Sequence, residues 1–175
     1  LSEKDSLVAL IYDNNKVDIC DFMGKTRFTF ETTLNKLMNE RLLRFFPDGN
    51  YLLAAVKDNS ILVFNENGDV VSELNVHSAN VNSVDISADG QFLATASSDN
   101  KVNIWKYNNS LKQMSLINTL TGHNDTVWSC EFNKTGKYII TASADSTVKI
   151  WNLYGRQINP EFQFLENRVR YNNRE

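Results

Sequence analysis

An internal repeat is the feature that most constrains the fold. Residues 81–105 and 127–151 align without a gap, and a histidine, His77 or His123, precedes each at the same distance. Repeats of this length are supersecondary units that cannot bury their own apolar faces and must stack on copies of themselves. The sequence therefore predicts a repeat architecture, which favours an interaction surface over an enzyme active site.

The repeat extends upstream when its anchor is taken as a turn residue followed six positions later by a bulky or apolar one. The anchor pairs are Asp145–Trp151, Asp99–Trp105, Asp58–Phe64 and, more loosely, Asn14–Cys20, which in this order are separated by 46, 41 and 44 residues. Around the anchors the apolar residues alternate with period two, as Val102 and Ile104 do on either side of Asn103. This alternation predicts strands rather than helices.

Turn residues divide each unit further. Turns containing Gly49, Gly90 and Gly136 fall between a first and a second strand, where glycine can adopt a positive φ. A third strand follows each Asp turn, and a fourth is predicted at 69–74, 115–120 and 161–165. Four short antiparallel strands in roughly 40–45 residues predict an all-β fold made of propeller blades.

These residues resemble the WD-repeat β-propeller family. The resemblance rests on Gly122-His123, on the turns Ser97-Ser98-Asp99 and Ser143-Ala144-Asp145, and on Ile104-Trp105 and Ile150-Trp151 in place of the family's hydrophobic-Trp-Asp ending. The Asp after Trp is absent, since Lys106 and Asn152 stand there. Two repeats match strongly, the one ending at Phe64 moderately and the first weakly.

The resemblance implies a partial β-propeller of four-stranded antiparallel blades, because such rings usually close with seven. The 175 residues provide an incomplete first blade (1–31), a second (32–75), a third (76–121) and a fourth with a C-terminal tail (122–175). We expect one propeller domain that is a segment of a longer chain or is completed by another chain. An open ring exposes two blade faces and should self-associate or fold loosely.

Residues 32–44 leave two alternatives. Leu34, Leu37, Met38 and Leu42 are spaced as on one face of a helix, which predicts a short surface helix between blades. The same segment also reads as a degenerate fourth strand followed by the first strand of the next blade, since Leu42 to Phe46 must begin that blade.

Composition excludes several functional classes. The formal charge of −3 argues against nonspecific nucleic-acid binding, and no apolar stretch approaches the ~18 residues of a membrane span. No signal peptide opens the chain. The two cysteines, Cys20 and Cys130, fall at strand positions without metal-like spacing and are predicted to be core thiols. An intracellular protein follows, with no cofactor, metal or small-molecule ligand expected.

Two sets of polar residues recur at repeat spacing. By the family's pattern, His, Thr, Asp and Trp form a hydrogen-bonded network within one blade; the sets here are His77, Thr95, Asp99, Trp105 and His123, Thr141, Asp145, Trp151. The list resembles a hydrolase triad. A structural role is the better interpretation, because the set occurs twice and its members can satisfy one another. Ala54 and Phe64 replace the Thr and Trp in the second blade, which should lack the network. No catalytic residues are assigned.

Partners in this family often dock on the narrow top face of the ring. Carried onto this chain, the family's docking positions are Asn80, Asn82, Ser98, Thr126, Trp128, Ala144 and Lys57. Trp128 lies on the alternation opposite to the core-facing residues, and a large aromatic at a rim is a typical binding hot spot. The alternative is that Trp128 packs under a neighbouring loop.

The sequence thus predicts a non-catalytic scaffold that binds other proteins or the remainder of its own propeller. Two alternatives remain. One is a sensor or regulatory propeller attached to a signalling ATPase or another catalytic domain outside this segment. The other is a structural subunit of a large assembly.

Overall fold

The computed structural model describes residues 7–12, 16–21, 23–31, 42–56, 59–65, 67–75, 77–108 and 113–158. They form four antiparallel sheets, and the neighbours within each sheet follow one another in the chain. Blade 1 contains β1 (Leu7–Ile11), β2 (Lys16–Asp21) and β3 (Thr26–Glu31); blade 2 contains β4 (Leu43–Phe45), β5 (Tyr51–Val56), β6 (Ser60–Asn65) and β7 (Val70–Asn75). Blade 3 contains β8 (Val81–Ile86), β9 (Phe92–Ser97), β10 (Val102–Asn108) and β11 (Gln113–Leu120); blade 4 contains β12 (Val127–Phe132), β13 (Tyr138–Ser143), β14 (Val148–Asn152) and β15 (Gln157–Ile158).

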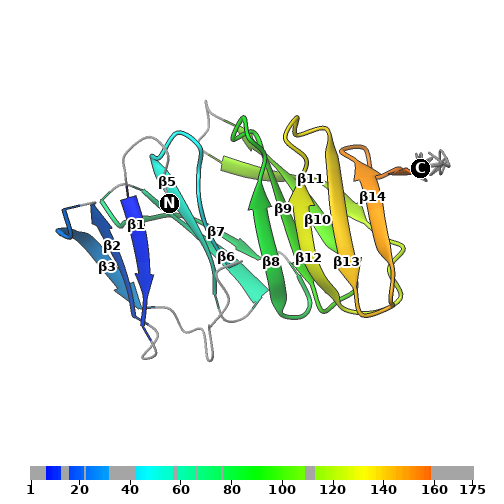
Figure 1. Ribbon diagram of the computed structural model, residues 1–175, viewed down its shortest axis with the longest axis horizontal. Coiled ribbons are helices and arrows are strands. Elements are labelled where there is room, and N and C mark those ends of the chain that lie inside the picture. Colours follow the sequence, from blue (N-terminus) through cyan, green and yellow to red (C-terminus); the bar gives the residue numbers. More distant parts are fainter. Residues whose placement is uncertain are drawn as a thin grey trace, which may run out of the picture.

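The blades stand side by side in chain order along the long axis of the molecule (Figure 1). This arrangement confirms the all-β fold of antiparallel propeller blades that the repeat predicted. It also follows from the sequence, because each sheet is a meander closed by short turns and is apolar on both faces, so each must pack between neighbours.

Turn geometry agrees with the sequence. Gly49, Gly90 and Gly136, between the first and second strands, have φ values of 74°, 69° and 67°. The turns between the second and third strands place Asn59, Asn100 and Ser146, at equivalent positions of the repeat, at φ values of 63°, 67° and 66°. A short polar side chain tolerates this left-handed conformation better than an apolar one, which explains the polar residue at all three positions.

Five edge strands of the described blades are bulged, whereas β1, β4 and β15 pair in unbroken register. In blades 3 and 4 the extra residue of the first strand is Asn82 or Trp128, and in the outer strands β3, β7 and β11 it is Arg27, Val71 or Ile117. The central pairs β5–β6, β9–β10 and β13–β14 keep an unbroken register. Irregular edges discourage another strand from adding to the sheet, so the blades join through their faces instead.

The core is divided among the three junctions between blades. Val17 and Ile19 of blade 1 pack with Phe64 of blade 2. Leu53 and Ile61 on the other face of blade 2 pack with Trp105 of blade 3. Blade 3 meets Trp151 of blade 4 in the same way.

Two predictions concerned irregular segments, the fourth strand of blade 4 and residues 32–44. The fourth strand of blade 4 was expected at 161–165, but it is β15, Gln157–Ile158, which pairs with β14. The prediction was wrong because the chain reverses immediately after β14, where Gly155 N donates to Asn152 O at 3.0 Å. Residues 161–165 and most of the ambiguous segment 32–44 lie outside the described residues, although Leu43–Phe45 is a strand. Within the described parts of the chain, no helix is long and apolar enough to cross a membrane.

Candidate functional site

In blade 4 the structure brings together the four polar side chains that the repeat singled out. His123 Nδ1 lies 2.8 Å from Asp145 Oδ2, and His123 Nε2 lies 2.7 Å from Thr141 Oγ1. The indole Nε1 of Trp151 donates to Thr141 Oγ1 at 2.9 Å. The chain of contacts therefore runs from the third strand to the second, then to the loop before the first strand, and ends in the turn after the second strand.

Each hydrogen bond of this network has a defined donor and acceptor. The Asp145 carboxylate can only accept, so His123 donates from Nδ1. In the neutral imidazole Nε2 is then an acceptor, and Thr141 donates to it while accepting from the indole of Trp151. Every polar atom of the four side chains that faces the interior is satisfied, which is the condition for burying such groups without penalty.

Asp145 also organises the turn in which it lies. It accepts hydrogen bonds from Asn124 N at 3.0 Å, Thr147 N at 2.9 Å and the Thr147 hydroxyl at 2.6 Å. The Thr147 hydroxyl is the largest cause that lowers the pKa of Asp145; the Asn124 and Thr147 amides and His123 act in the same direction, and burial opposes them. The Asp145 carboxylate therefore remains ionised at pH values well below the ordinary pKa of an aspartate. It joins the loop that contains Asn124 to the turn that contains Thr147.

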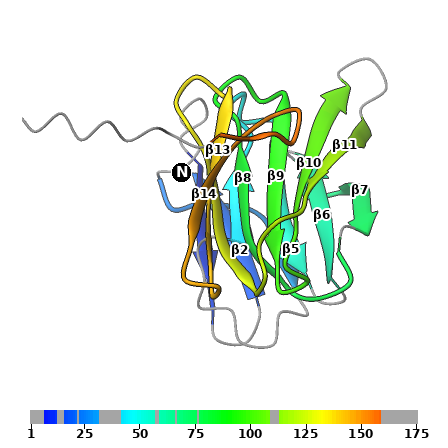
Figure 2. The ribbon, with the colours of Figure 1, turned by 90° about the vertical axis from the view of Figure 1, so that its right-hand side faces the viewer.

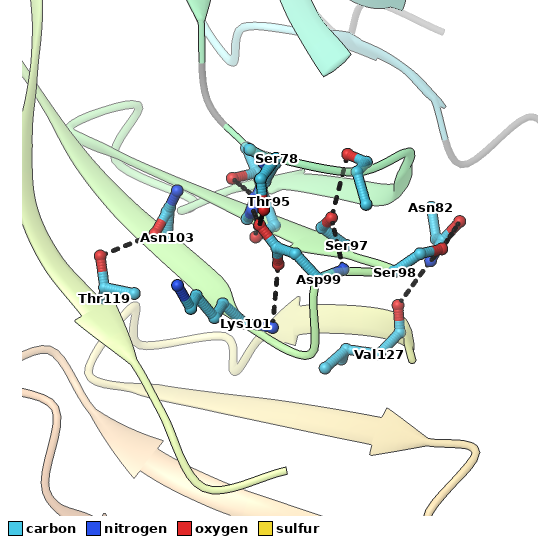
Figure 3. Close-up of polar contacts among 12 residues, drawn as sticks. Ser78, Asn82, Thr95, Ser97, Ser98, Asp99, Lys101, Asn103, Thr119 and Val127 are labelled. Carbon is cyan, nitrogen blue, oxygen red and sulfur yellow. Dashed lines mark hydrogen bonds and ion pairs between the residues drawn. The ribbon is translucent and has the colours of Figure 1, made fainter. Parts of the chain in front are cut away.

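Blade 3 repeats the arrangement less tightly. His77 Nδ1 lies 2.9 Å from Asp99 Oδ2 and Nε2 lies 2.8 Å from Thr95 Oγ1, but the Trp105 indole is 3.4 Å from that hydroxyl. Asp99 also accepts from Lys101 N at 3.0 Å (Figure 3). Burial by itself raises the pKa of Asp99, but His77 and the backbone N–H groups of Ser78 and Lys101 outweigh it, so this pKa lies below its ordinary value.

These networks are closed to substrates. The side chains of His77 and His123 are 0% and 2% exposed, and both are fully occupied by partners within their own blade. A triad needs a nucleophile that can reach a substrate, whereas Thr141 and Thr95 are buried at 0% exposure beneath the indoles. The geometry suits a structural role.

The positions proposed for partner docking lie at one end of blades 3 and 4, where the first strand begins and the second ends. We call this set the loop face; its described members are Asn80, Asn82, Ser98, Thr126, Trp128 and Ala144. Ser98 N donates to Asn80 O and Ala144 N donates to Thr126 O, both at 2.9 Å. Equivalent loops of the two blades are thus fixed in the same way. Lys57 lies outside the described residues.

Two equivalent residues of the loop face differ in their contacts. Asn82 Nδ2 donates to Ser98 Oγ at 3.0 Å and to Val127 O of blade 4 at 2.9 Å, so this side chain spans the junction between blades (Figure 3). Trp128, the bulged residue at the same position of blade 4, is 55% exposed. It points away from the core, as its place in the strand alternation predicted.

The sequence did not predict one contact between blades, which is made by Asp85. Asp85 of β8 accepts from Phe132 N of β12 at 2.7 Å, and its other oxygen lies 3.6 Å from Arg44 Nε of β4. A single carboxylate therefore links the first strands of three blades. Burial is the largest influence on Asp85 and raises its pKa, against the opposing effects of Phe132 N and Arg44.

The residue that follows the tryptophan has a defined role as well. Asn152 Oδ1 accepts from Tyr154 N and Arg156 N, both at 3.0 Å, and Asn65 and Asp21 cap their own turns in the same manner. An amide oxygen thus replaces the carboxylate expected in the family. Lys106 has no oxygen to offer; there β10 continues to Asn108, beyond the point where the other third strands turn.

Two comparisons with known proteins bear on this geometry. The family described as "WD domain, G-beta repeat" matches residues 68–106 and 114–152. The first match begins two residues before the outer strand β7 and the second begins in the outer strand β11, and each ends in the third strand of the next blade. The sequence repeat is therefore out of phase with the sheets and ties neighbouring blades together covalently.

A segment of 83 residues is 35% identical to Elongator complex protein 2 of Drosophila melanogaster. The alignment covers 42% of this chain but only 10% of that protein. The similarity and the family matches agree with the blade topology and with the repeated His–Thr–Asp–Trp geometry. Residues 68–106 and 114–152 are therefore similar to WD40 repeats, and the four sheets are arranged as blades of a partial β-propeller.

Proposed function

We propose that this chain is part of a non-catalytic protein-interaction module whose partners dock on the loop face. WD40 repeats generally serve as scaffolds for protein–protein interaction. The observation that carries the proposal is Trp128, a large aromatic side chain of the loop face that is 55% exposed. Tryptophan is enriched among the residues that contribute most to protein interfaces.

The loop face is organised before any partner binds. The backbone bonds from Ser98 to Asn80 and from Ala144 to Thr126 fix the two loops, and Asp145 draws Asn124 toward the same turn. A surface whose loops are already ordered loses less conformational entropy on binding. The hydrogen-bond networks beneath the loop face thereby contribute to binding without touching a partner.

The expected partner is a protein segment that places an apolar group against Trp128 and hydrogen-bonding groups against Asn80 and Ser98. We expect the module to be intracellular and to bind neither nucleic acid nor membrane, in keeping with its net charge of −3. Trp128 does not require a small-molecule cofactor for this role.

A second candidate function is a structural subunit of a large assembly. The name of the Drosophila relative, Elongator complex protein 2, describes a member of a complex. Because the alignment covers 10% of that protein, membership in the same complex does not carry over with the repeats.

The test compares two exposed aromatic residues at opposite ends of blade 4. Trp128 lies at the loop face, whereas Tyr154, 90% exposed, lies in the turn after β14 at the other end. A photo-crosslinking amino acid at Ala144 first captures the cellular partner from the intact protein. Trp128→Ala should then weaken the purified complex by ~2 kcal/mol, about 30-fold, and change folding stability by less than ~0.5 kcal/mol.

Tyr154→Ala is the matched control and should leave affinity unchanged. Equal losses of affinity in the two variants would contradict docking at the loop face. A loss of ~3–5 kcal/mol in folding stability for Trp128→Ala would instead place Trp128 in a packed interior and remove it as a docking residue.

A further inference from the structure

The turn between β6 and β7 contains the one Asn-Gly pair of the sequence, Asn67-Gly68. Asn67 is exposed, and the two strands that the turn joins lie at the same side of the molecule as β10 and β11 (Figure 2). Asparagine is chemically labile, because its side-chain carbonyl can be attacked by the backbone nitrogen of the next residue. Glycine hinders this attack least, since it has no Cβ. The pair is therefore a candidate for spontaneous modification.

The same turn precedes the outer strands of blades 1 and 4. Its glycine has a φ of 79° at Gly24, 85° at Gly68 and 79° at Gly155, and a left-handed backbone of this kind favours glycine. The residue before the glycine differs in all three turns, being Met23, Asn67 and Tyr154. The turn thus requires the glycine but not the asparagine.

The turn glycine also lies against the neighbouring blade. A Cβ added at Gly68 would lie 2.6 Å from Cδ2 of Phe28 in β3 of blade 1. A Cβ added at Gly155 would likewise lie 2.5 Å from Nδ2 of Asn118 in β11 of blade 3. A change in the backbone of the turn at Gly68 would therefore disturb the contact between blades 1 and 2.

Asn65 holds this turn closed. Its backbone oxygen accepts from Gly68 N at 3.0 Å, and its side-chain oxygen accepts from Asn67 N and Asp69 N, both at 2.9 Å. Attack on Asn67 requires the Gly68 nitrogen to lose its proton and to approach the side-chain carbon Cγ. Because the Gly68 N–H is bound to Asn65, the closed turn opposes both steps.

We propose that Asn67-Gly68 is a self-modification site, at which Asn67 converts to aspartate or isoaspartate at a rate controlled by the cap of Asn65. The Gly68 nitrogen forms a bond to Cγ of Asn67, and the side-chain amide leaves as ammonia, taking up the proton that Gly68 loses. Water then opens the cyclic imide at either of its carbonyls, which gives aspartate or isoaspartate. The reaction needs water alone as a co-reactant, and the proposal does not depend on docking at the loop face.

The isoaspartate product should loosen the junction between blades 1 and 2. In isoaspartate the chain continues through the side-chain carbon, so the backbone of the turn is longer. A longer turn cannot keep both the bond from Gly68 N to Asn65 O and the close contact of Gly68 with Phe28. Aspartate keeps the original backbone and should leave the junction intact.

The experiment follows the conversion of Asn67 in the intact protein by peptide mass spectrometry at mildly alkaline pH. Conversion should be at least about tenfold slower in the folded protein than in urea, because the closed turn must open before attack. Asn65→Ala should remove most of this difference. Asn65→Asp is the matched control and should keep the slow rate, since the Asp21 carboxylate caps the equivalent turn of blade 1.

A second site separates opening of this turn from unfolding of the whole protein. Tyr154→Asn places the same pair in the turn of blade 4, where Asn152 is the cap. In the double variant Asn65→Ala, Tyr154→Asn, position 67 should react fast while position 154 stays slow. Equal acceleration at both positions would overturn control by the local cap.

The effect on the junction is measured on the separated products. The isoaspartate form should unfold at a lower urea concentration than the unmodified protein, whereas Asn67→Met, incubated in the same way, should show no such change with time. An isoaspartate form as stable as the unmodified protein would overturn the predicted loosening.

Three further results would overturn the proposal. The first is the absence of conversion at position 67 even in urea, because the pair would then not be a modification site. The second is conversion in the folded protein that is as fast as in urea. The third is a folded Asn65→Ala variant that converts as slowly as the unsubstituted protein, since protection would then not come from the cap.

Discussion

Blades 2 and 4 fill the same interior positions with different chemistry. Blade 2 has Ala54 and Phe64, which are buried in an apolar cluster. Blade 4 has Thr141 and Trp151 at those positions, equally buried but joined by a hydrogen bond that continues to His123 and Asp145. The backbone of a blade therefore does not require the polar network.

The difference shows what the network adds. In the part of blade 2 that the structure describes, the apolar packing of Ala54 and Phe64 connects the strands to the neighbouring blade. In blade 4 the network joins the loop before β12 to the turn after β13, because His123 and Asp145 come from those two segments. We infer that the polar solution orders the loop face, while apolar packing alone is enough to hold the strands.

The largest expected effect on stability comes from removing the buried aromatic ring that both blades have. Trp151→Ala and Phe64→Ala should each lower the free energy of unfolding by ~3–5 kcal/mol, since both delete a buried ring and leave a cavity. Denaturant unfolding of each variant measures the change. Similar losses would support equal packing roles, whereas a small loss for Phe64→Ala alone would show that blade 2 is loosely packed.

An intermediate effect should separate the blades. Thr141→Val keeps the shape of the side chain but leaves His123 Nε2 and the Trp151 indole without a partner, and should lower the free energy of unfolding by ~1–3 kcal/mol. The reciprocal change, Ala54→Ser, buries a hydroxyl in an apolar cluster and should be destabilising by a similar ~1–3 kcal/mol. A neutral Thr141→Val would mean that the network contributes nothing beyond packing.

In blade 4 the backbone at Gly122 closely approaches the ring of Trp151. Gly122 precedes His123, and a Cβ added at Gly122 would lie 3.2 Å from the Trp151 ring. The Gly-His pair is thus part of how the indole is seated, and the sequence motif has a steric reason. Nothing in the period-two pattern alone reveals this contact.

Much of the fold could be predicted from the sequence because its signals are local. Alternation such as Val102, Asn103 and Ile104 identifies a strand, and Gly90 or Gly136 identifies the turn between the first and second strands of a blade. The recurrence of His and Asp at fixed spacing indicated which side chains meet in blades 3 and 4. Repetition made a long-range contact visible, since an accidental set would not occur twice.

The features that the sequence did not predict depend on how segments far apart in the chain are placed relative to one another. The bond from Phe132 N to Asp85 forms only when two blades lie at their observed distance, so no local pattern predicts it. Similarly, β15 follows β14 at once because Asn152 caps a tight turn, and the sequence assigned the strand too late. Lys106 is the opposite case. It has no side-chain oxygen to cap a turn, and there β10 continues to Asn108.

The smallest expected effect concerns two carboxylates with opposite pKa shifts. Asp145 in the network has a pKa below the ordinary value of about 4, so its stabilising contribution is complete above that value and is lost as the pH falls through the folded pKa. Asp85 between blades has a raised pKa. The folded chain then holds the Asp85 proton more tightly than the unfolded chain, and acidification toward pH ~4 favours folding at that site.

The two shifts should therefore shape one stability profile. From pH 6 to about 4 the free energy of unfolding should hold steady or rise slightly because of Asp85, and below about 4 it should fall as Asp145 and Asp99 are protonated. Asp85→Asn should remove the first part of the profile, and Asp145→Asn should weaken the second while lowering stability at neutral pH. Urea unfolding at pH 6, 5, 4 and 3 measures all three chains. If Asp85→Asn leaves the profile between pH 6 and 4 unchanged, the carboxylate between the blades is not sufficiently desolvated to titrate differently on folding, and the networks within the blades alone set the pH dependence.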